Sequence, residues 1–372
     1  MCLLLSAVSS SGAQPNGSDL ADNSRYLFPA TAAWTVVLPA AAAAPGALDD
    51  RHLYVPLVDG RLVALARESG ATVWTRAIGV AGSPHPAGAR LLVPTQNGIA
   101  RLDPRTGAPV WTTPVAGAPF TSLVALETVV AGLTAGGLAA ALDLDTGALL
   151  WTRELGPVAA PALAGAGDRL HAGLEDGRVV TFASADGRVL WERTLDGPLT
   201  ALAGDGTRLA VGSAANALVG LDAASGGVAW HWRIGGDVVG STVGAGHVYV
   251  TALDNRLRAL ARGSGNQRWQ RLLSTRPAHP PLVVGEAVLV SGVGPEIAAF
   301  DTLTGEPLGT YTVPAELRGP VLADPAPEPY DVVLAMVTRT NVAIGLRPTR
   351  LQLTEPPLAP LAELPGRALT LP

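Results

Sequence analysis

Two histidines are the side chains with the clearest potential for metal chemistry. His85 lies in Ser-Pro-His-Pro and His279 in Ala-His-Pro-Pro, and each begins a predicted strand. Two imidazoles could bind a transition metal, but a zinc site needs a third protein ligand and none is apparent in the sequence. We therefore interpret both histidines as hydrogen-bonded or solvated loop residues, with metal binding as the alternative.

Other catalytic signatures are missing from the sequence. It contains no Gly-x-Ser-x-Gly, no phosphate-binding loop and no His-Glu-x-x-His. All 26 basic residues are arginine, so chemistry through a lysine Schiff base is excluded. Net charge is −5 and no basic run occurs, which argues against a nucleic-acid groove.

The N-terminus resembles part of an export signal. An apolar run from Met1 to Val8 is followed by the small residues Ser11 and Ala13, the pattern of a signal peptide and its cleavage site. The positive residues that usually precede such a run are missing, so residues 1–26 are either a clipped export signal or a disordered leader. The single cysteine, Cys2, excludes an intrachain disulfide and would be a lipid-bearing residue if the true start lies upstream. No stretch of about 18–20 apolar residues predicts a transmembrane helix.

A repeat dominates the chain. Glycine, three residues and tryptophan recur six times, and the tryptophans are 37 to 40 residues apart. A seventh copy, Gly305 to Gly309, keeps the spacing but lacks the tryptophan, and Trp34 lies 40 residues before Trp74. A period near 40 with short strands is typical of propeller blades. The tryptophans that we expect to dock one blade on the next are Trp34, Trp74, Trp111, Trp151, Trp191, Trp230 and Trp269.

Each repeat is predicted to form four strands, A to D. In the repeat that ends at Trp191, these are Ala160–Ala164, Arg169–Leu174, Arg178–Ala183 and Arg188–Leu195. Asp176-Gly177 between B and C is a strong hairpin signal, because a type I′ turn needs positive φ at both central residues. Strand A is rich in small residues, as at Ala40–Ala44, which suits the crowded axis of a ring.

The strand count predicts how the ring closes. After seven complete frames, residues 318–323, 331–338 and 341–347 supply strands A, B and C of an eighth blade. Thr31–Leu38 is a strand D with no A, B or C before it, and we expect it to complete that blade and cover the open edges. The sequence thus predicts an all-β, eight-bladed propeller of four-stranded antiparallel blades over residues 27–347. Residues 348–372 hold six prolines and are predicted to be a tail outside the fold.

Positions two residues after the tryptophan carry a second pattern. Four repeats place arginine there: Arg76, Arg153, Arg193 and Arg271. We interpret these as charges that protect the outer edge strand, with cation–π contact as the alternative. Trp232 occupies this position in its own repeat, where nothing in the frame requires an indole. It is therefore our candidate partner contact, with simple packing as the alternative.

The repeat resembles a known family. Ala141-Leu-Asp-Leu-Asp-Thr-Gly-Ala-Leu-Leu-Trp151 has the pattern of the pyrroloquinoline-quinone (PQQ)-like repeat, which returns at 102–111 and 221–230. Members of this family are either quinoprotein dehydrogenases that bind PQQ and usually calcium, or non-enzymatic propellers of the BamB type, which assist outer-membrane-protein assembly as lipoproteins. Length and blade count resemble the BamB type.

The chemistry of the predicted channel mouth agrees with the non-enzymatic branch. A PQQ site must neutralise three carboxylates, yet only three arginines are expected there: Arg276, Arg318 and Arg339. The acids are scattered over several loops: Asp59, Asp176, Asp196, Asp237, Asp254 and Glu316. We therefore expect no cofactor and no catalytic site.

These observations give one leading hypothesis and two alternatives. The leading hypothesis is an exported, periplasmic or outer-membrane-associated monomer that binds envelope or outer-membrane proteins. The resemblance implies the β-barrel assembly machinery as its partner. The alternatives are a PQQ-dependent oxidoreductase and the sensor half of a larger envelope system.

Overall fold

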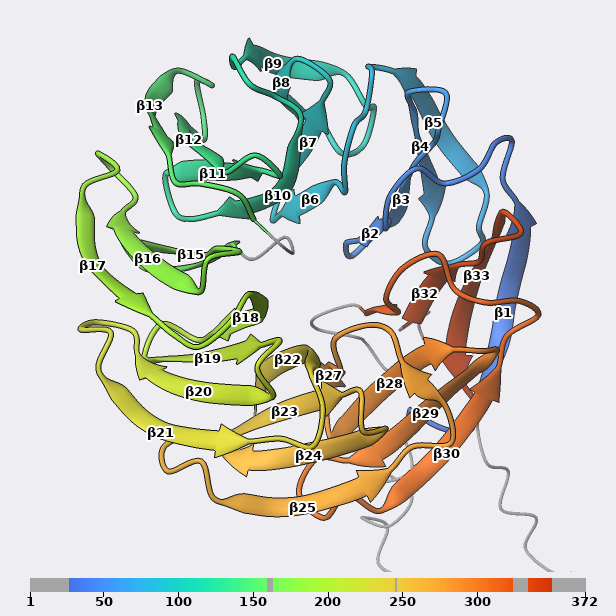
Figure 1. Ribbon diagram of the computed structural model, residues 1–372. Helices are drawn as coiled ribbons and strands as arrows, with labels where there is room; N and C mark the ends of the chain where they lie inside the picture. The colour runs from blue at the N-terminus through green and yellow to red at the C-terminus, as the bar shows by residue number, and fades with distance from the viewer. Residues whose placement is uncertain (1–26, 159–162, 245, 324–333, 350–372) are drawn as a thin grey trace, which may run out of the picture.

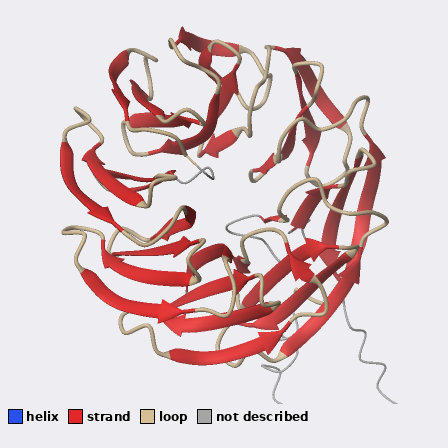
Figure 2. Cartoon of the chain, in the orientation of Figure 1, coloured by secondary structure: helices blue, strands red, loops and turns tan. Residues whose placement is uncertain are grey.

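The protein is a closed ring of β-sheets. A computed structural model describes residues 27–158, 163–244, 246–323 and 334–349, and these residues form strands, turns and loops without a helix (Figure 2). The strands assemble into eight antiparallel sheets arranged around a central axis (Figure 1). The predicted eight-bladed propeller is confirmed.

Seven blades are built from consecutive strands, which run from the axis to the rim. Blades 1 to 4 consist of β2 (Ala47–Leu48), β3 (His52–Pro56), β4 (Arg61–Ala66) and β5 (Thr72–Ala77); β6 (His85–Ala87), β7 (Arg90–Thr95), β8 (Gly98–Leu102) and β9 (Pro109–Pro114); β10 (Phe120–Ala125), β11 (Val129–Thr134), β12 (Leu138–Asp143) and β13 (Leu149–Glu154); and β14 (Leu163–Ala166), β15 (Arg169–Gly173), β16 (Arg178–Ala183) and β17 (Val189–Thr194). Blades 5 to 7 consist of β18 (Leu199–Gly204), β19 (Arg208–Ser213), β20 (Ala217–Asp222) and β21 (Val228–Arg233); β22 (Val238–Gly244), β23 (His247–Ala252), β24 (Arg256–Ala261) and β25 (Gln267–Leu272); and β26 (Arg276–Pro277), β27 (Leu282–Val284), β28 (Ala287–Val293), β29 (Glu296–Asp301) and β30 (Pro307–Thr312).

Blade 8 joins the two ends of the described chain. β1 (Ala30–Val37) pairs with β33 (Val342–Pro348), which is followed inward by β32 (Leu334–Val337) and β31 (Leu322–Ala323). The predicted closure by the N-terminal strand is therefore confirmed, with a shift of one residue at each end of that strand. β33 extends one residue beyond the predicted end of the propeller. Most of the predicted leader and tail lies outside the described residues.

The innermost strands are shorter than predicted in blade 1. Within the predicted Ala40–Ala44 strand only Ala42 pairs, through a single bridge to Leu57, and the regular strand β2 begins after Pro45. Proline has no N–H to donate to a sheet, so it interrupts the pairing. The axis is crowded at this point, since a Cβ on Gly319 of blade 8 would lie 2.9 Å from the Cβ of Pro45.

Every outermost strand carries a β-bulge at the residue before the tryptophan position. In blade 1, Trp74 pairs with Ala64 and Thr72 with Leu65, so Val73 is the extra residue. The same shift occurs in the other seven blades. Bulges twist an edge away from regular pairing and so protect it from other strands.

The core is divided among the seams between blades. The cluster between blades 1 and 2, for example, contains Trp74 and Ala64 from one blade and Leu91 and Ala100 from the other. Eight such clusters surround the axis, which explains the 48% hydrophobic composition. Within the part of the chain that the structure describes, no helix has the length and apolar character that crossing a membrane requires.

Candidate functional site

Each tryptophan of the repeat lies at a seam and contacts the next blade. Its indole Nε1–H donates a hydrogen bond to a backbone carbonyl in the C–D turn of that blade, at distances from 2.5 to 3.3 Å. The acceptors, in chain order, are Arg67, Pro104, Leu144, Ser184, Ala223, Arg262 and Thr302. This places all seven tryptophans where blade docking requires them.

The repeat glycine is the surface against which the indole packs. A Cβ on Gly107 would lie 2.6 Å from the Trp74 ring, and Gly107 has a φ of 66°. The close approach leaves no room for a Cβ at this position. Glycine is also the residue that adopts this positive φ at little cost. At the seventh frame, where Gly309 replaces tryptophan, the Phe28 side chain lies 3.1 Å from the equivalent Cβ position. Phe28 is buried at this seam, so a residue of the N-terminal segment packs where the repeat tryptophan is missing.

The position two residues after the tryptophan also joins neighbouring blades. An Arg76 amino group donates to the Thr106 carbonyl at 2.9 Å, and Arg271 Nε donates to the Gly305 carbonyl at 2.7 Å. The Thr113 hydroxyl donates a corresponding inter-blade hydrogen bond to the Gly147 carbonyl at 2.6 Å. For these residues the structure shows a specific inter-blade hydrogen bond, which our interpretation as edge-protecting charge did not include.

Trp232 shares this position but packs against apolar neighbours. It is partly buried, lies opposite Leu218 on the adjacent strand, and packs on the cluster that contains Trp230 and Ile234. This contact agrees with the packing alternative. A role in partner binding stays a prediction.

One end of the ring, the BC face, carries the B–C turns and D–A loops, and its acids are largely paired. Asp59 binds Arg61 and Asp176 binds Arg178, each at 2.6 Å. The hydrogen bond from the Arg61 side chain holds the pKa of Asp59 below its usual value. Burial opposes ionisation of Asp176, but hydrogen bonds from Arg178 outweigh it and lower that pKa too.

Two further predicted acids are paired in the same way. Arg258 pairs with Asp254, and Arg339 lies 3.1 Å from Glu316. Arg318 instead donates to the Ala43 carbonyl at 3.4 Å. Four of the six predicted acids thus pair with a nearby arginine, and of the three predicted cations only Arg339 pairs with an acid among the described residues.

The two histidines lie on different blades. His85 begins β6 in blade 2, and His279 lies between β26 and β27 in blade 7. Both are partly buried, and burial lowers both pKa values. Within the described residues no three His, Cys, Asp or Glu side chains gather closely enough to hold a metal ion.

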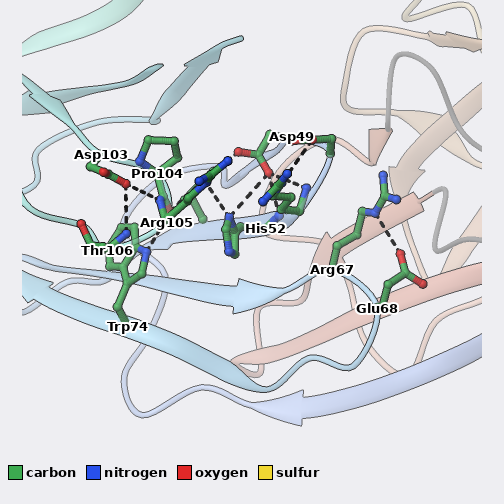
Figure 3. A network of polar contacts seen from close by, with 12 residues as sticks. Asp49, His52, Arg67, Glu68, Trp74, Asp103, Pro104, Arg105 and Thr106 are labelled. Carbon is green, nitrogen blue, oxygen red and sulfur yellow. Dashed lines mark hydrogen bonds and ion pairs between the residues drawn. The ribbon is translucent and has the colours of Figure 1, made fainter. Parts of the chain in front are cut away.

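The opposite end of the ring, the CD face, carries the A–B and C–D turns and contains a cleft between blades 1 and 2. It has a volume of about 670 Å³. One wall comes from the β2–β3 turn and the other from β6, β8 and the β8–β9 turn. Figure 3 shows Asp49 and His52 from the first wall and Asp103, Pro104 and Arg105 from the second. The lining includes the charged residues Asp49, Asp50, Arg51, Arg101, Asp103 and Arg105 and the apolar residues Leu48, Pro86, Leu102 and Val110. The volume is in the range of ligand-binding clefts.

A buried polar network lies next to this cleft. Tyr54 is fully buried and donates its hydroxyl hydrogen to an Asp49 carboxylate oxygen at 2.7 Å. His52 Nδ1 lies 3.2 Å from the same hydroxyl oxygen. Because the Tyr54 proton points to Asp49, Nδ1 of His52 must carry its own proton and donate, which leaves Nε2 as an acceptor. Burial lowers the pKa of His52, so it is neutral at pH 7.

Sequence reasoning missed this cleft. A usable signal existed in the C–D turns, because Arg105 is the one basic residue two positions before the repeat glycine in the seven frames; the others are Glu68, Asp145, Ala185, Ala224, Gly263 and Leu303. Finding the cleft from the sequence also required knowing what each turn faces on the neighbouring blade.

Comparison with known proteins agrees with the seams and ring described above. The family profile described as "Outer membrane protein assembly factor BamB" matches residues 29–159, 58–203 and 175–359, which together span nearly the whole propeller. The chain belongs to this family. No curated protein matches the sequence.

Solved structures show how widely the fold of this BamB-family chain is shared. BamB from Moraxella catarrhalis is 17% identical with a TM-score of 0.67, and the match covers 86% of this chain and 99% of that one. The computationally designed Ika8 protein is 16% identical with a TM-score of 0.69, covering 84% and 97%. The C-terminal WD40 domain of Sif2 is 10% identical with a TM-score of 0.72, covering 86% and 99%. At these identities the likeness shows the fold alone.

Proposed function

We propose that this chain is a non-enzymatic scaffold of the cell envelope that binds proteins involved in outer-membrane protein assembly. The family match over residues 29–359 is the observation that carries the proposal. A rigid ring of eight docked blades supports it, because such a ring displays many turns on two faces while its strands remain fixed. The proposed location is the periplasm, in association with the outer membrane.

Pairing at the BC face supports the non-enzymatic part of the proposal. A general base acts best when its pKa lies near the working pH, whereas the pKa values of Asp59 and Asp176 are lowered by their arginine partners. The arginines of these turns are themselves engaged, so they are poorly suited to binding a tricarboxylate such as PQQ.

Co-purification from the envelope tests the partner class. The chain, tagged and expressed in its native host, should enrich components of the β-barrel assembly machinery from solubilised envelopes. The designed Ika8 propeller, which shares the fold, is the matched bait. Equal enrichment by both baits, or none by either, would contradict the proposal.

A titration with PQQ and calcium tests the enzymatic alternative. We expect no heat of binding at micromolar protein, because Arg61, Arg178 and Arg339 on this face already pair with local acids. Stoichiometric binding in the micromolar range would reject the non-enzymatic assignment in favour of a quinoprotein.

A further inference from the structure

The cleft between blades 1 and 2 lies where other seams are bridged. Between blades 2 and 3, Arg90 at the start of strand B binds Asp145 in the next C–D turn at 2.9 Å. Between blades 4 and 5, Arg169 donates to the Ala224 carbonyl at the same two positions, at 2.9 Å. These contacts tie the CD face of one blade to the next.

The equivalent positions at the cleft cannot form this bridge. His52 replaces the arginine, and Arg105 replaces the acid. His52 is neutral and already bonded to Tyr54. Within the described part of the chain, the guanidinium of Arg105 makes no ion pair or hydrogen bond, so an exposed cation is left at an open seam.

The acids that line the cleft are engaged elsewhere. One Asp49 oxygen accepts the backbone N–H groups of Arg51 at 2.8 Å and His52 at 2.6 Å, and the other accepts the Tyr54 hydroxyl. Asp103 accepts the backbone N–H of Arg105 at 2.7 Å. These carboxylates hold their own turns in place and leave the Arg105 guanidinium without a counter-ion.

Apolar surface extends from the cleft along the rim of the ring. Val110, which lines the cleft, is 55% exposed, and the corresponding outer-strand residues Leu149, Leu150 and Val189 are 47%, 44% and 38% exposed. The docking tryptophans beside them, Trp111, Trp151 and Trp191, are only partly buried. The outer strands of blades 1 and 5 add Val73 and Val228, which are 46% and 50% exposed, whereas blade 6 has Gln267 and Arg268 at these positions. The apolar rim therefore runs from blade 1 to blade 5.

We propose that this cleft and rim bind an extended segment of a protein partner in which an acidic side chain precedes apolar ones. The partner's carboxylate pairs with the Arg105 guanidinium, which supplies the counter-ion that the seam lacks, in the two-pronged geometry that arginine favours. Its apolar side chains then cover Val110 and Leu150 along the rim. The inference rests on the proposed scaffold function and adds the surface and the chemistry of the partner.

Synthetic peptides test this surface directly. The probe has one glutamate followed by three leucines that alternate with serines, and two comparison peptides replace the glutamate by glutamine or the leucines by serine. Fluorescence anisotropy should show that the probe binds the full chain, and that R105A weakens binding about tenfold or more, as expected for a charge-assisted contact. L150S should weaken it further. R268A is the matched control, since Arg268 is an exposed arginine on the outer strand of blade 6, away from the proposed surface.

A double-mutant cycle decides whether the predicted pair forms. The glutamine peptide should bind R105A and wild type equally, because the same contact has already been removed. No binding of the probe to wild type, or equal loss with R105A and R268A, would overturn the proposal. An R105E variant with unchanged melting that still enriches envelope partners would reject the cleft while leaving the scaffold function standing. If the wild-type chain enriches no envelope partner, the proposed scaffold function itself would be rejected.

Discussion

At the scale of single residues, each seam depends on one indole and one glycine. The indole removes a large apolar surface from water and also satisfies its only donor, as in the 2.8 Å bond from Trp230 Nε1 to the Arg262 carbonyl. The opposing Gly265 has no side chain because a Cβ there would lie 2.7 Å from the Trp230 ring. The two residue types are therefore required together, which is why the sequence shows them in one frame.

Trp230 and Trp232 should differ in their contribution to stability. We expect W230A to lower the free energy of unfolding by about 3–5 kcal/mol, as for other buried aromatics, because it loses both the packing and the hydrogen bond. W232A removes a partly buried ring whose indole makes no hydrogen bond to the described residues, so it should cost less. Thermal melts of both variants measure this difference, and co-purification from envelopes tests the partner role of Trp232. Equal destabilisation would show that Trp232 is a core residue.

His171 should make stability dependent on pH. It is buried in β15, with Nδ1 2.7 Å from Thr181 Oγ1, and burial together with Arg169 lowers its pKa to about 4. The unfolded pKa is about 6.5, so the unfolded chain binds the proton more readily. Stability is fully present above pH 6.5 and is lost as pH falls from there toward 4, by about 3 kcal/mol for this one group.

The H171N variant tests this linkage. Asparagine can keep the hydrogen bond to Thr181 but does not titrate, so urea unfolding should show a flatter pH dependence between 6.5 and 4. The exposed His231 provides the control variant, H231N. Parallel pH profiles for wild type and H171N would contradict the assignment.

At the scale of elements, blade 7 shows how one seam survives without its tryptophan. Leu27 and Phe28 precede β1 and pack with Val313 and Leu317 of the neighbouring connection. Phe28 therefore occupies the place of the side chain that Gly309 lacks. The closing strand thus carries two contacts, its own Trp34 and this phenylalanine.

Removing Phe28 should open the seventh seam. F28A is expected to lower the free energy of unfolding by about 3–5 kcal/mol, since the ring is almost fully buried. L303A, at an exposed leucine in the C–D turn of the same blade, should have little effect. Chemical denaturation compares the two, and similar losses would mean that Phe28 does not seal the seam.

The repeat made the regular strands predictable, but it did not predict the irregular contacts between blades. The Gly-x-x-x-Trp frame and the hairpin turns gave strands B to D closely, as at Arg178–Ala183, which is observed without change. Strand A was harder to predict because prolines such as Pro45 interrupt it. Phe28 and Arg105 were missed because each acts through a neighbour across a seam, and the sequence records the neighbour's identity without recording the contact.

At the scale of the whole molecule, the ring couples all its seams. Eight clusters lie between blades, and each blade supplies residues to two of them. Opening one seam therefore exposes the apolar faces of two neighbouring sheets to water. Both ends of the described chain meet in blade 8, where β1 lies between β33 and the solvent.

Truncation at the two ends should accordingly have opposite results. Deleting residues 1–38 removes β1, Trp34 and Phe28, exposes the edge of β33, and empties two seams, so we expect unfolding or aggregation. Deleting residues 350–372 begins after β33 and removes none of the described residues, so the melting temperature should stay nearly unchanged. Melting scans and size-exclusion chromatography of both truncations measure this. A large loss from the C-terminal deletion would show that the ring depends on a contact beyond Thr349, and a stable N-terminal deletion would show that the ring closes with a three-stranded eighth blade.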